Sequence, residues 1–294
     1  MALSVRAAPK PVAVNLLGVV EHPEMGPDPY LVDRDGRPFV PAGDGGVVLG
    51  VHVGDPLWSL AGEHVAPGAT LAHPDGAARH ALTAQACLGN AVEVLTGAAR
   101  GSRGRVVGKR GEAGRVIVSL PDAALARLLP GDRVRVEAFG QGAALEGVSG
   151  VEVMNVDPAL LAHMPLHRDG ERVTAEVRAV VPGRLCGNGV GRPSALWDLD
   201  LQVYPAEAGR IGCDDLRLGD LVAIEDWDGR FNHGYRRGTV TVGVVVHGPS
   251  RLPGHGPGVV AVLTGASERL APAVRVDPSE NLDVWLRALD GRGP

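Results

Sequence analysis

The chain has 294 residues, a net charge of −5 and only 3% aromatic residues, so it cannot coat nucleic acid or an anionic membrane wholesale, although a local basic patch is compatible with this charge. Three widely spaced cysteines with no CxxC pair exclude a disulfide framework and a cysteine zinc site. The chain has no signal-peptide pattern and no apolar run of 18 residues, and we therefore expect a cytoplasmic protein with no membrane partner.

Short valine-rich runs, separated by 42 glycines and 23 prolines, predict a mainly β fold. Three short helices are predicted from their start signals. These signals are Pro121-Asp122, Asp157-Pro158 and Asp277-Pro278, each of which precedes an apolar run. The rest of the chain is expected to form strands and turns.

Near the N-terminus, Glu21-His22-Pro23-Glu24 places an imidazole among carboxylates. Asp44, in PAGDGG, and His52, in VHVGD, follow in the same part of the chain. Imidazole nitrogens and carboxylate oxygens suit zinc, iron or manganese. We therefore include His22 among the candidate metal ligands.

Residues 86–148 have the strand and turn pattern of a small SH3-like, KOW-type barrel, with glycines where turns and bulges need positive φ angles. We predict that this barrel is inserted into a layered β-sandwich body formed by residues 1–85 and 149–294. The barrel carries six basic residues within sixteen positions, at 100, 103, 105, 109, 110 and 115. They form either a phosphate-binding face or a solvated hairpin, and the stretch lacks the aromatic residues that usually stack on single-stranded RNA.

The loop VPGRLCGNGVGRPS, at 181–194, is a candidate ligand-binding loop. Its glycines let main-chain amides approach a small ligand, so we assign substrate binding to Asn188, Gly189 and Arg192. Cys186 lies in the same loop, and a thiol nucleophile there would need a base such as His247. The alternative is an inert, packed cysteine.

Further along, Asp214-Asp215 offers carboxylates, and we name Asp215 as a catalytic partner.

The stretch VVVHGPSRLPGHGPG, at 244–258, combines a strand end with a loop rich in glycine and proline. His247 ends the predicted strand, and His255 lies in the loop between Gly254 and Gly256. We predict that both histidines are catalytic, and that the two flanking glycines let the backbone bind substrate. Together with His22, the same two histidines are the candidate ligands of a divalent metal such as zinc, although no HExxH spacing occurs.

Several phrases resemble an uncharacterised prokaryotic family, domain of unknown function 4438. They are EHP at 21–23, LGNAVEVLTGAARGSRGRVVGKRG at 88–111, VMNVDPALL at 153–161, DLRLGDLVAIEDWDG at 215–229 and the VVVHG and GHGPG phrases at 244–258. The resemblance covers nearly the whole chain. It implies a mainly β fold with a barrel inserted into a sandwich, and it implies no activity. A fainter resemblance to acetamidase and formamidase proteins, in loop Gly, His and Asp, bears only on the choice of reaction class.

Two functions from different classes follow. The first is an enzyme that hydrolyses or cyclises an amide-like bond in a small polar molecule, by acid/base or metal-assisted chemistry of His247, His255 and Asp215. The second is a binding module that contacts RNA or another polyanion through the arginine-rich barrel. The acidic net charge and the missing aromatic residues favour the enzyme. A homo-oligomer is compatible with either function, because valine-rich sheet edges commonly pair.

Overall fold

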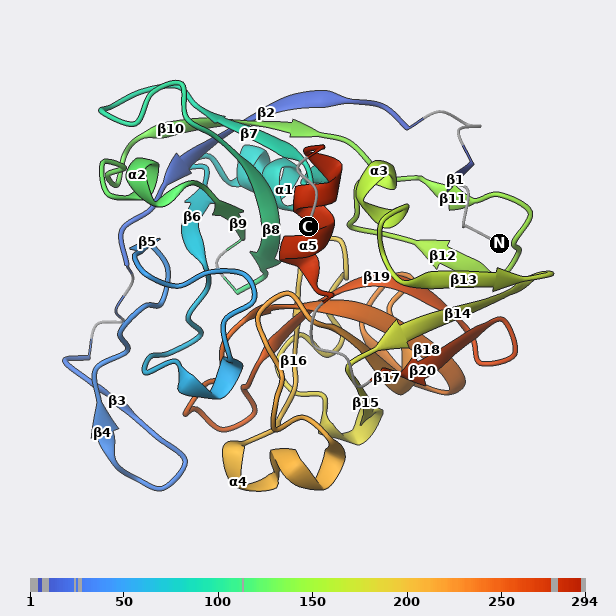
Figure 1. The fold of residues 1–294 in the computed structure, drawn as a ribbon. Coiled ribbons are helices and arrows are strands. Elements are labelled where there is room, and N and C mark those ends of the chain that lie inside the picture. The colour runs from blue at the N-terminus through green and yellow to red at the C-terminus, as the bar shows by residue number, and fades with distance from the viewer. Residues whose placement is uncertain are drawn as a thin grey trace.

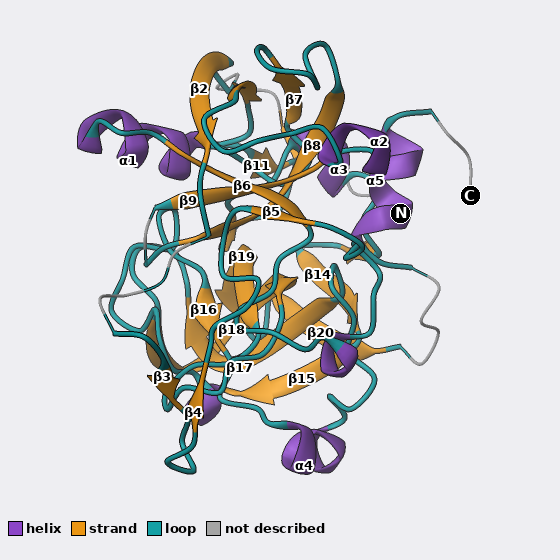
Figure 2. Cartoon of the chain, turned by 90° about the vertical axis from the view of Figure 1, so that its left-hand side faces the viewer, coloured by secondary structure: helices purple, strands orange, loops and turns teal. Residues whose placement is uncertain are grey.

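A computed structural model describes residues 5–6, 11–23, 25, 28–112, 114–275 and 280–291. The protein is mainly β, with a closed six-stranded antiparallel barrel, further packed sheets and a few short helices, as predicted (Figures 1 and 2). Among the described residues, no helix is both long and apolar enough to cross a membrane.

The barrel closes because its first and last strands pair with each other. Its strands follow the order β2, β10, β7, β8, β9, β6, and β2 pairs with β6. They are β2 (Val14–Val20), β6 (Gly68–Ala72), β7 (Ala91–Val94), β8 (Arg103–Arg110), β9 (Arg115–Ser119) and β10 (Arg133–Ala138), with β5 (Val47–Val48) added beside β6. The predicted segment 86–148 thus supplies four of the six strands, and β2 and β6 come from residues before it. The predicted domain boundaries stay a prediction.

The body contains an eight-stranded sheet, a three-stranded sheet that packs against it, and a small hairpin. The large sheet consists of β1 (Val5–Arg6), β11 (Ala144–Leu145), β12 (Val151–Val153), β15 (Ala179–Pro182), β16 (Leu199–Asp200), β17 (Leu221–Asp228), β18 (Gly234–His247) and β19 (Gly258–Ala266). The small sheet consists of β13 (Leu166–Asp169), β14 (Arg172–Val177) and β20 (Leu270–Val274), and the hairpin of β3 (Leu31–Val32) and β4 (Pro38–Phe39). One apolar core joins the two body sheets, and a separate core fills the barrel.

Helices connect and cover these sheets. They are α1 (Gly76–Gln85), α2 (Asp122–Leu125), α3 (Pro158–Leu161), α4 (Pro205–Ala208) and α5 (Leu282–Leu289), with short 3₁₀ turns at Leu57–Ser59, Gly183–Leu185 and Gly209–Ile211. The helices α2, α3 and α5 begin near the predicted start signals. The cap of α5 is Asn281, because its side chain accepts a hydrogen bond from the Asp283 amide, whereas Asp277 lies outside the described residues. The helix α1 was not predicted from the sequence, although Asp75 caps it.

The strands β18 and β19 form the centre of the molecule. Their valines are buried on both faces. Val242, Val244 and Val260 share a core with Val107 of β8 and with the three-stranded sheet, whereas Val245 and Val259 pack in another core that includes Leu57, Leu199 and Leu201. Figure 2 shows the barrel at one end of the molecule and the body at the other. The ends of β18 and β8 and the start of β19 therefore meet where the barrel joins the body.

Asp220 gives a pH-dependent test of this packing. It is buried just before β17, where its carboxylate accepts a hydrogen bond from the Arg217 amide at 2.8 Å. Burial raises its pKa to about 6 from the ordinary 3.8. Because the folded-state pKa is the higher one, ionised Asp220 costs stability above pH 6, and this cost disappears as the pH falls from 6 to 3.8.

We therefore expect Asp220→Asn to stabilise the protein at pH 8 by roughly 2 kcal/mol and to have little effect near pH 4. Asparagine keeps an oxygen that can accept the Arg217 hydrogen bond. Urea unfolding of both proteins at the two pH values measures the difference. An equal effect at pH 4 and pH 8 would show that the ionisation of Asp220 is not its cause.

Candidate metal centre

Three histidines from distant parts of the chain meet where the barrel joins the body. His64 lies in the loop before β6, His247 ends β18, and His255 lies in the loop before β19. The ring centroid of His64 is 5.1 Å from that of His247 and 5.2 Å from that of His255. His64 and His247 are buried, and His255 is 22% exposed at its side chain. Solvent thus reaches the cluster from the His255 side.

Strand register places two carboxylates beside these histidines. In β16, Asp200 pairs with Gly258 of β19, and Gly258 also pairs with His247 of β18. Since Gly258 has no side chain, the side chains of His247 and Asp200 meet over it. Asp198 lies two residues before Asp200, and its Oδ2 is 2.8 Å from His247 Nε2.

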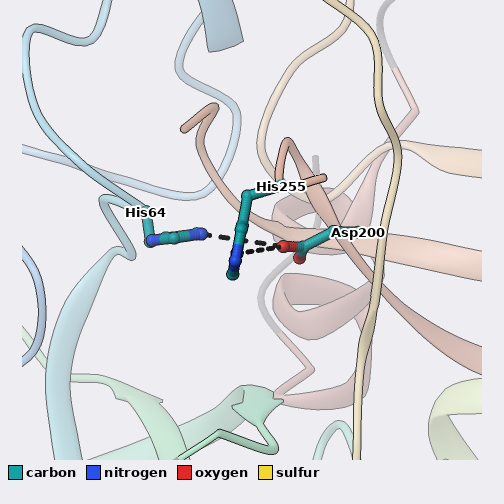
Figure 3. A group of neighbouring side chains, drawn as sticks. All are labelled: His64, Asp200 and His255. Carbon is teal, nitrogen blue, oxygen red and sulfur yellow. Dashed lines mark ion pairs between the residues drawn. The ribbon is translucent and has the colours of Figure 1, made fainter. Parts of the chain in front are cut away.

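Asp200 faces all three histidines. Its Oδ2 is 3.1 Å from His255 Nδ1 and 3.6 Å from His64 Nε2 (Figure 3). Its Oδ1 is 3.5 Å from His247 Nε2. The ligand atoms of His64, Asp200 and His255 all lie within 4.8 Å of one another, as do those of Asp198, Asp200 and His247. These are the two groups of this kind among the described residues.

Buried polar atoms without hydrogen bonds concentrate in the group of His64, Asp200 and His255. Both ring nitrogens of His64, Asp200 Oδ2 and His255 Nδ1 are buried, yet within the described part of the chain they make no hydrogen bond of normal geometry. They lie at ion-pair distance but are not directed along donor and acceptor lines. Buried polar atoms without hydrogen bonds are costly, and they are expected where an ion is the missing partner. This pattern fits a cation between His64, Asp200 and His255.

The distances between these ligand atoms also fit a bound zinc ion. Ligands bound about 2.1 Å from a tetrahedral zinc ion lie about 3.4 Å from one another. The Asp200 distances to His255 and His64, 3.1 and 3.6 Å, lie on either side of that value. Two imidazoles and one carboxylate also leave coordination positions open, as in catalytic rather than structural sites.

Burial opposes protonation of His247, but its hydrogen bond to Asp198 and the nearby Asp200 carboxylate outweigh burial and raise its pKa to about 10. The nearby Asp200 carboxylate likewise raises the pKa of His255. Burial favours the neutral form of Asp200, yet the surrounding histidines hold the pKa of its carboxyl well below the usual range. Without a metal, protons on His247 and His255 thus supply the positive charge that the carboxylates attract.

His64 has a strained backbone, with φ at +48°. A residue with a Cβ seldom adopts this left-handed conformation, although histidine does so more often than most. The loop places the ring against Glu63, whose Oε1 is 3.2 Å from His64 Nδ1. Glu63 is itself buried, and it accepts hydrogen bonds from Ser250 Oγ and from the Arg251 amide. Such strain commonly occurs at functional positions.

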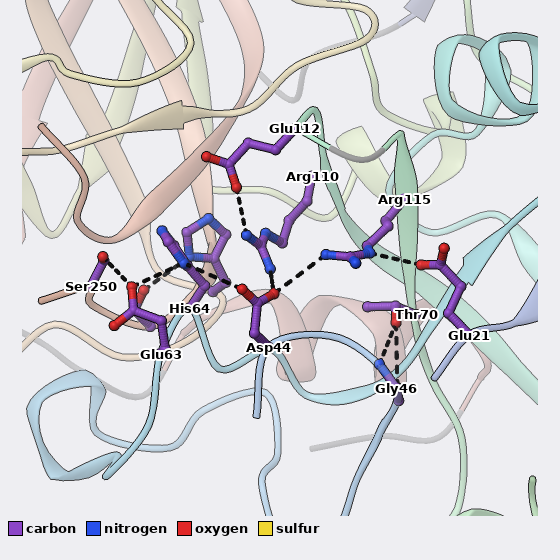
Figure 4. Close-up of polar contacts among 12 residues, drawn as sticks. Glu21, Asp44, Gly46, Glu63, His64, Thr70, Arg110, Glu112, Arg115 and Ser250 are labelled. Atoms are coloured by element: carbon purple, nitrogen blue, oxygen red, sulfur yellow. Dashed lines mark hydrogen bonds and ion pairs between the residues drawn. The ribbon is translucent and has the colours of Figure 1, made fainter. Parts of the chain in front are cut away.

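A chain of ion pairs links the cluster to the barrel (Figure 4). Glu21 pairs with Arg115, Arg115 and Arg110 both pair with Asp44, and Arg110 continues to Glu112 at 2.8 Å. The Oε1 of Glu112 then lies 3.4 Å from His255 Nδ1. The network thereby fixes Glu112 at the open edge of the cluster.

We expect Arg110→Met to destabilise the protein by about 3 kcal/mol, because the side chain of Arg110 is 2% exposed and its removal leaves Asp44 and Glu112 without their shared counterion. Arg135→Met is the matched control. It breaks the 2.7 Å pair with Glu93, in which Arg135 is 44% exposed, and should cost less than about 1 kcal/mol. Denaturant unfolding compares the two variants, and equal costs would argue against a structural role for the network.

The structure brings together several residues that the sequence analysis assigned to the site. The amide of Asn188 donates to the Gly254 carbonyl, and the Asp200 amide donates to the Asn188 carbonyl, so both predicted loops border Asp200. The side chain of Asn188 also donates to Glu112 at 2.6 Å. A Cβ on Gly189 would overlap the Asp198 carbonyl, and one on Gly256 would overlap the Leu201 carbonyl, on either side of β16, so these two glycines permit close packing of the backbone.

Other predicted residues lie outside the cluster. His22 is exposed and belongs to neither ligand group. Asp215, also exposed, pairs with Arg178. Arg192 stacks over the ring of Trp197 at 4.8 Å. Cys186 packs in an apolar core where burial raises the pKa of its thiol, which favours the inert thiol over a nucleophile.

Five residues at the cluster were not predicted from the sequence as site residues: His64, Asp198, Asp200, Glu63 and Glu112. One signal was present in the alternation of WDLDLQ, which places Asp198 and Asp200 on the same face of a strand. For His64 there was no local signal.

The fold and the cluster define a class: mainly β proteins in which a small barrel joins a body of packed sheets, with histidines and carboxylates at the junction. The model of the domain of unknown function DUF4438, N-terminal, matches residues 30–162, and that of its C-terminal domain matches residues 163–286. The chain belongs to the DUF4438 family. A solved structure described as "Crystal structure of TM1086" is 35% identical, with a TM-score of 0.89 over 94% of this chain and 96% of that chain. No curated protein matches the chain.

Proposed function

We propose that this protein is a metal-dependent enzyme that hydrolyses or cyclises an amide-like bond in a small polar substrate. The observation that carries the proposal is the convergence of His64, Asp200 and His255, whose buried nitrogens and oxygen make no hydrogen bond of normal geometry among the described residues. Zinc or another first-row divalent cation suits this mixture of nitrogen and oxygen ligands. When bound, such an ion polarises a carbonyl and lowers the pKa of a bound water.

Each residue of the group His64, Asp200 and His255 would be a ligand of the ion. His64 would bind the ion through Nε2, while Glu63 Oε1 lies 3.2 Å from Nδ1 on the other side of the ring. His255 would bind through Nδ1, and Asp200 through Oδ2. His22, expected as a third ligand from the sequence, is replaced by His64.

Glu112 is the best candidate for a general base. Its side chain is 33% exposed, and its two oxygens are oriented by Asn188 and Arg110. It also lines a cavity of about 380 Å³, together with Arg79, His80, Arg192 and Trp197. A base at the edge of the cluster can take a proton from water on the substrate side, and the arginines favour a substrate with a negative group.

The test is elemental analysis of the purified protein after metal depletion and reconstitution with zinc or manganese. We expect at least one equivalent of metal in the wild type, and a loss of at least one equivalent in His64→Ala and in His255→Ala. His52→Ala is the control, because His52 is an exposed histidine that contacts Asp55 and Asp122 outside both ligand groups. A wild type that retains no metal would overturn the proposal, and retained metal would justify a screen of amides.

The alternative function, binding of RNA or another polyanion, needs the arginines of residues 100–115 to share one exposed face. Arg110 and Arg115 are buried, and so is Lys109, whose Nζ donates to three oxygens. Arg105 pairs with Asp290. Exposure of Arg100 and Arg103 alone gives a small basic patch, so no observation favours this alternative. Assembly into a homo-oligomer stays a prediction.

A further inference from the structure

The two ligand groups share Asp200, and we propose that the centre binds two divalent cations bridged by its carboxylate. The first cation is the one of the proposed function, on which this inference rests. The second would lie between His247, Asp198 and the other oxygen of Asp200.

The orientation of the Asp200 carboxylate is the first observation that supports two cations. Its Oδ2 faces His255 at 3.1 Å and His64 at 3.6 Å, whereas its Oδ1 faces His247 at 3.5 Å. The two oxygens of one carboxylate therefore point to different sets of histidines. In two-metal hydrolytic sites the ions lie about 3.5–4 Å apart, a separation that a bridging carboxylate spans.

His247 is oriented as a metal ligand. Its Nδ1 lies 2.9 Å from the Gly248 carbonyl oxygen and donates to it, which leaves Nε2 directed at the two aspartates. A backbone carbonyl on the far nitrogen of an imidazole is a common outer contact of metal-bound histidines, because it determines which nitrogen is free to bind. The side chain is 1% exposed, so its position is well restrained.

Asp198 is oriented as well. Its Oδ1 accepts a hydrogen bond from the Gly111 amide at 2.9 Å, and its Oδ2 lies 2.8 Å from His247 Nε2. One oxygen is thus held by the barrel while the other faces the second group. Asp198, Asp200 and His247 are all buried, and their ligand atoms lie within 4.8 Å of one another.

Two cations would divide the chemistry of hydrolysis. One would hold and activate the water, and the other would polarise the carbonyl oxygen of an amide on which negative charge develops. Glu112 and His255 stand at the exposed edge, and the second group lies deeper. Solvent reaches the second group less readily than the first, so substrate would enter from the Glu112 side.

Equilibrium dialysis of the metal-depleted full chain against Mn²⁺, followed by elemental analysis, gives the stoichiometry directly. We expect two equivalents in the wild type and in the His52→Ala control, one in His247→Ala, and none in Asp200→Ala. Electron paramagnetic resonance of the fully loaded wild type should show two exchange-coupled Mn²⁺ ions, and His247→Ala should show an isolated ion.

The outcomes separate the two proposals. No bound Mn²⁺ in the wild type overturns the two-cation centre, and it overturns the proposed function as well if reconstitution with zinc also leaves the wild type without metal. One equivalent in the wild type, with the signal of an isolated ion, overturns the second cation and leaves the proposed function intact, whether or not His247→Ala retains that ion. Because the wild-type stoichiometry and spectrum decide the question, a variant that fails to fold does not affect the conclusion.

Discussion

Asp200→Asn is expected to abolish the response of the protein to divalent cations. The substitution keeps the size of the side chain and removes the charge that faces all three histidines. Loss of a partner outside the ligand shell typically lowers metal affinity 10- to 100-fold, so loss of this central ligand should lower it by more than about 100-fold. Any metal-dependent activity should fall by at least as much.

Thermal unfolding measures the effect without knowledge of the substrate. At a free cation concentration of 1,000 times Kd, binding stabilises the native state by about 4 kcal/mol, which corresponds to a rise in Tm of roughly 6–7 °C for a chain of 294 residues. We expect this rise in the wild type and none in Asp200→Asn. Asp220→Asn is the matched control, because it replaces another buried aspartate that belongs to neither ligand group. A full response in Asp200→Asn would exclude the centre as the binding site.

Local patterns predicted much of the fold. Valine-rich runs and glycine-rich turns indicate strands, and the pattern of residues 86–148 indicates a small barrel, which the structure contains. The pattern did not reveal that β2 and β6 complete the barrel. These strands precede the segment, and their pairing with β10 and β9 depends on contacts between residues far apart in the chain.

Only those candidate site residues that lie close together in the chain could be predicted from the sequence. His247 and His255 stand out because a strand end and a glycine-rich loop flank them within 15 residues. Asp200 joins them only through the register of β16, a strand of two residues, with β19. His64 joins them through a loop that precedes a barrel strand. The alternation in WDLDLQ places Asp198 and Asp200 on one strand face, but it does not show which histidines that face meets, and His64 has no local signal. These two ligands could therefore not be assigned from the sequence.

Gly258→Ala is expected to disrupt the centre without changing any ligand. Gly258 lies between Asp200 and His247 in the register of β16, β19 and β18, and a Cβ there would overlap His247 Nε2 and crowd Asp198 Oδ2. The three strands hold the backbone, so the imidazole must move. We expect the cation affinity to fall about 10- to 100-fold, and the free energy of unfolding to fall by about 1–3 kcal/mol because of overpacking.

Gly234→Ala separates this effect from the general cost of adding a methyl group to a strand glycine. Gly234 also lies in β18 and has an ordinary φ, and the nearest atom to its added Cβ is 3.9 Å away. That variant should bind cations like the wild type and keep its stability within about 0.5 kcal/mol. If Gly258→Ala retained wild-type affinity while losing stability, His247 could move without cost to the bound ion. The glycine would then serve packing alone, and the ligand set would reduce to His64, His255 and Asp200.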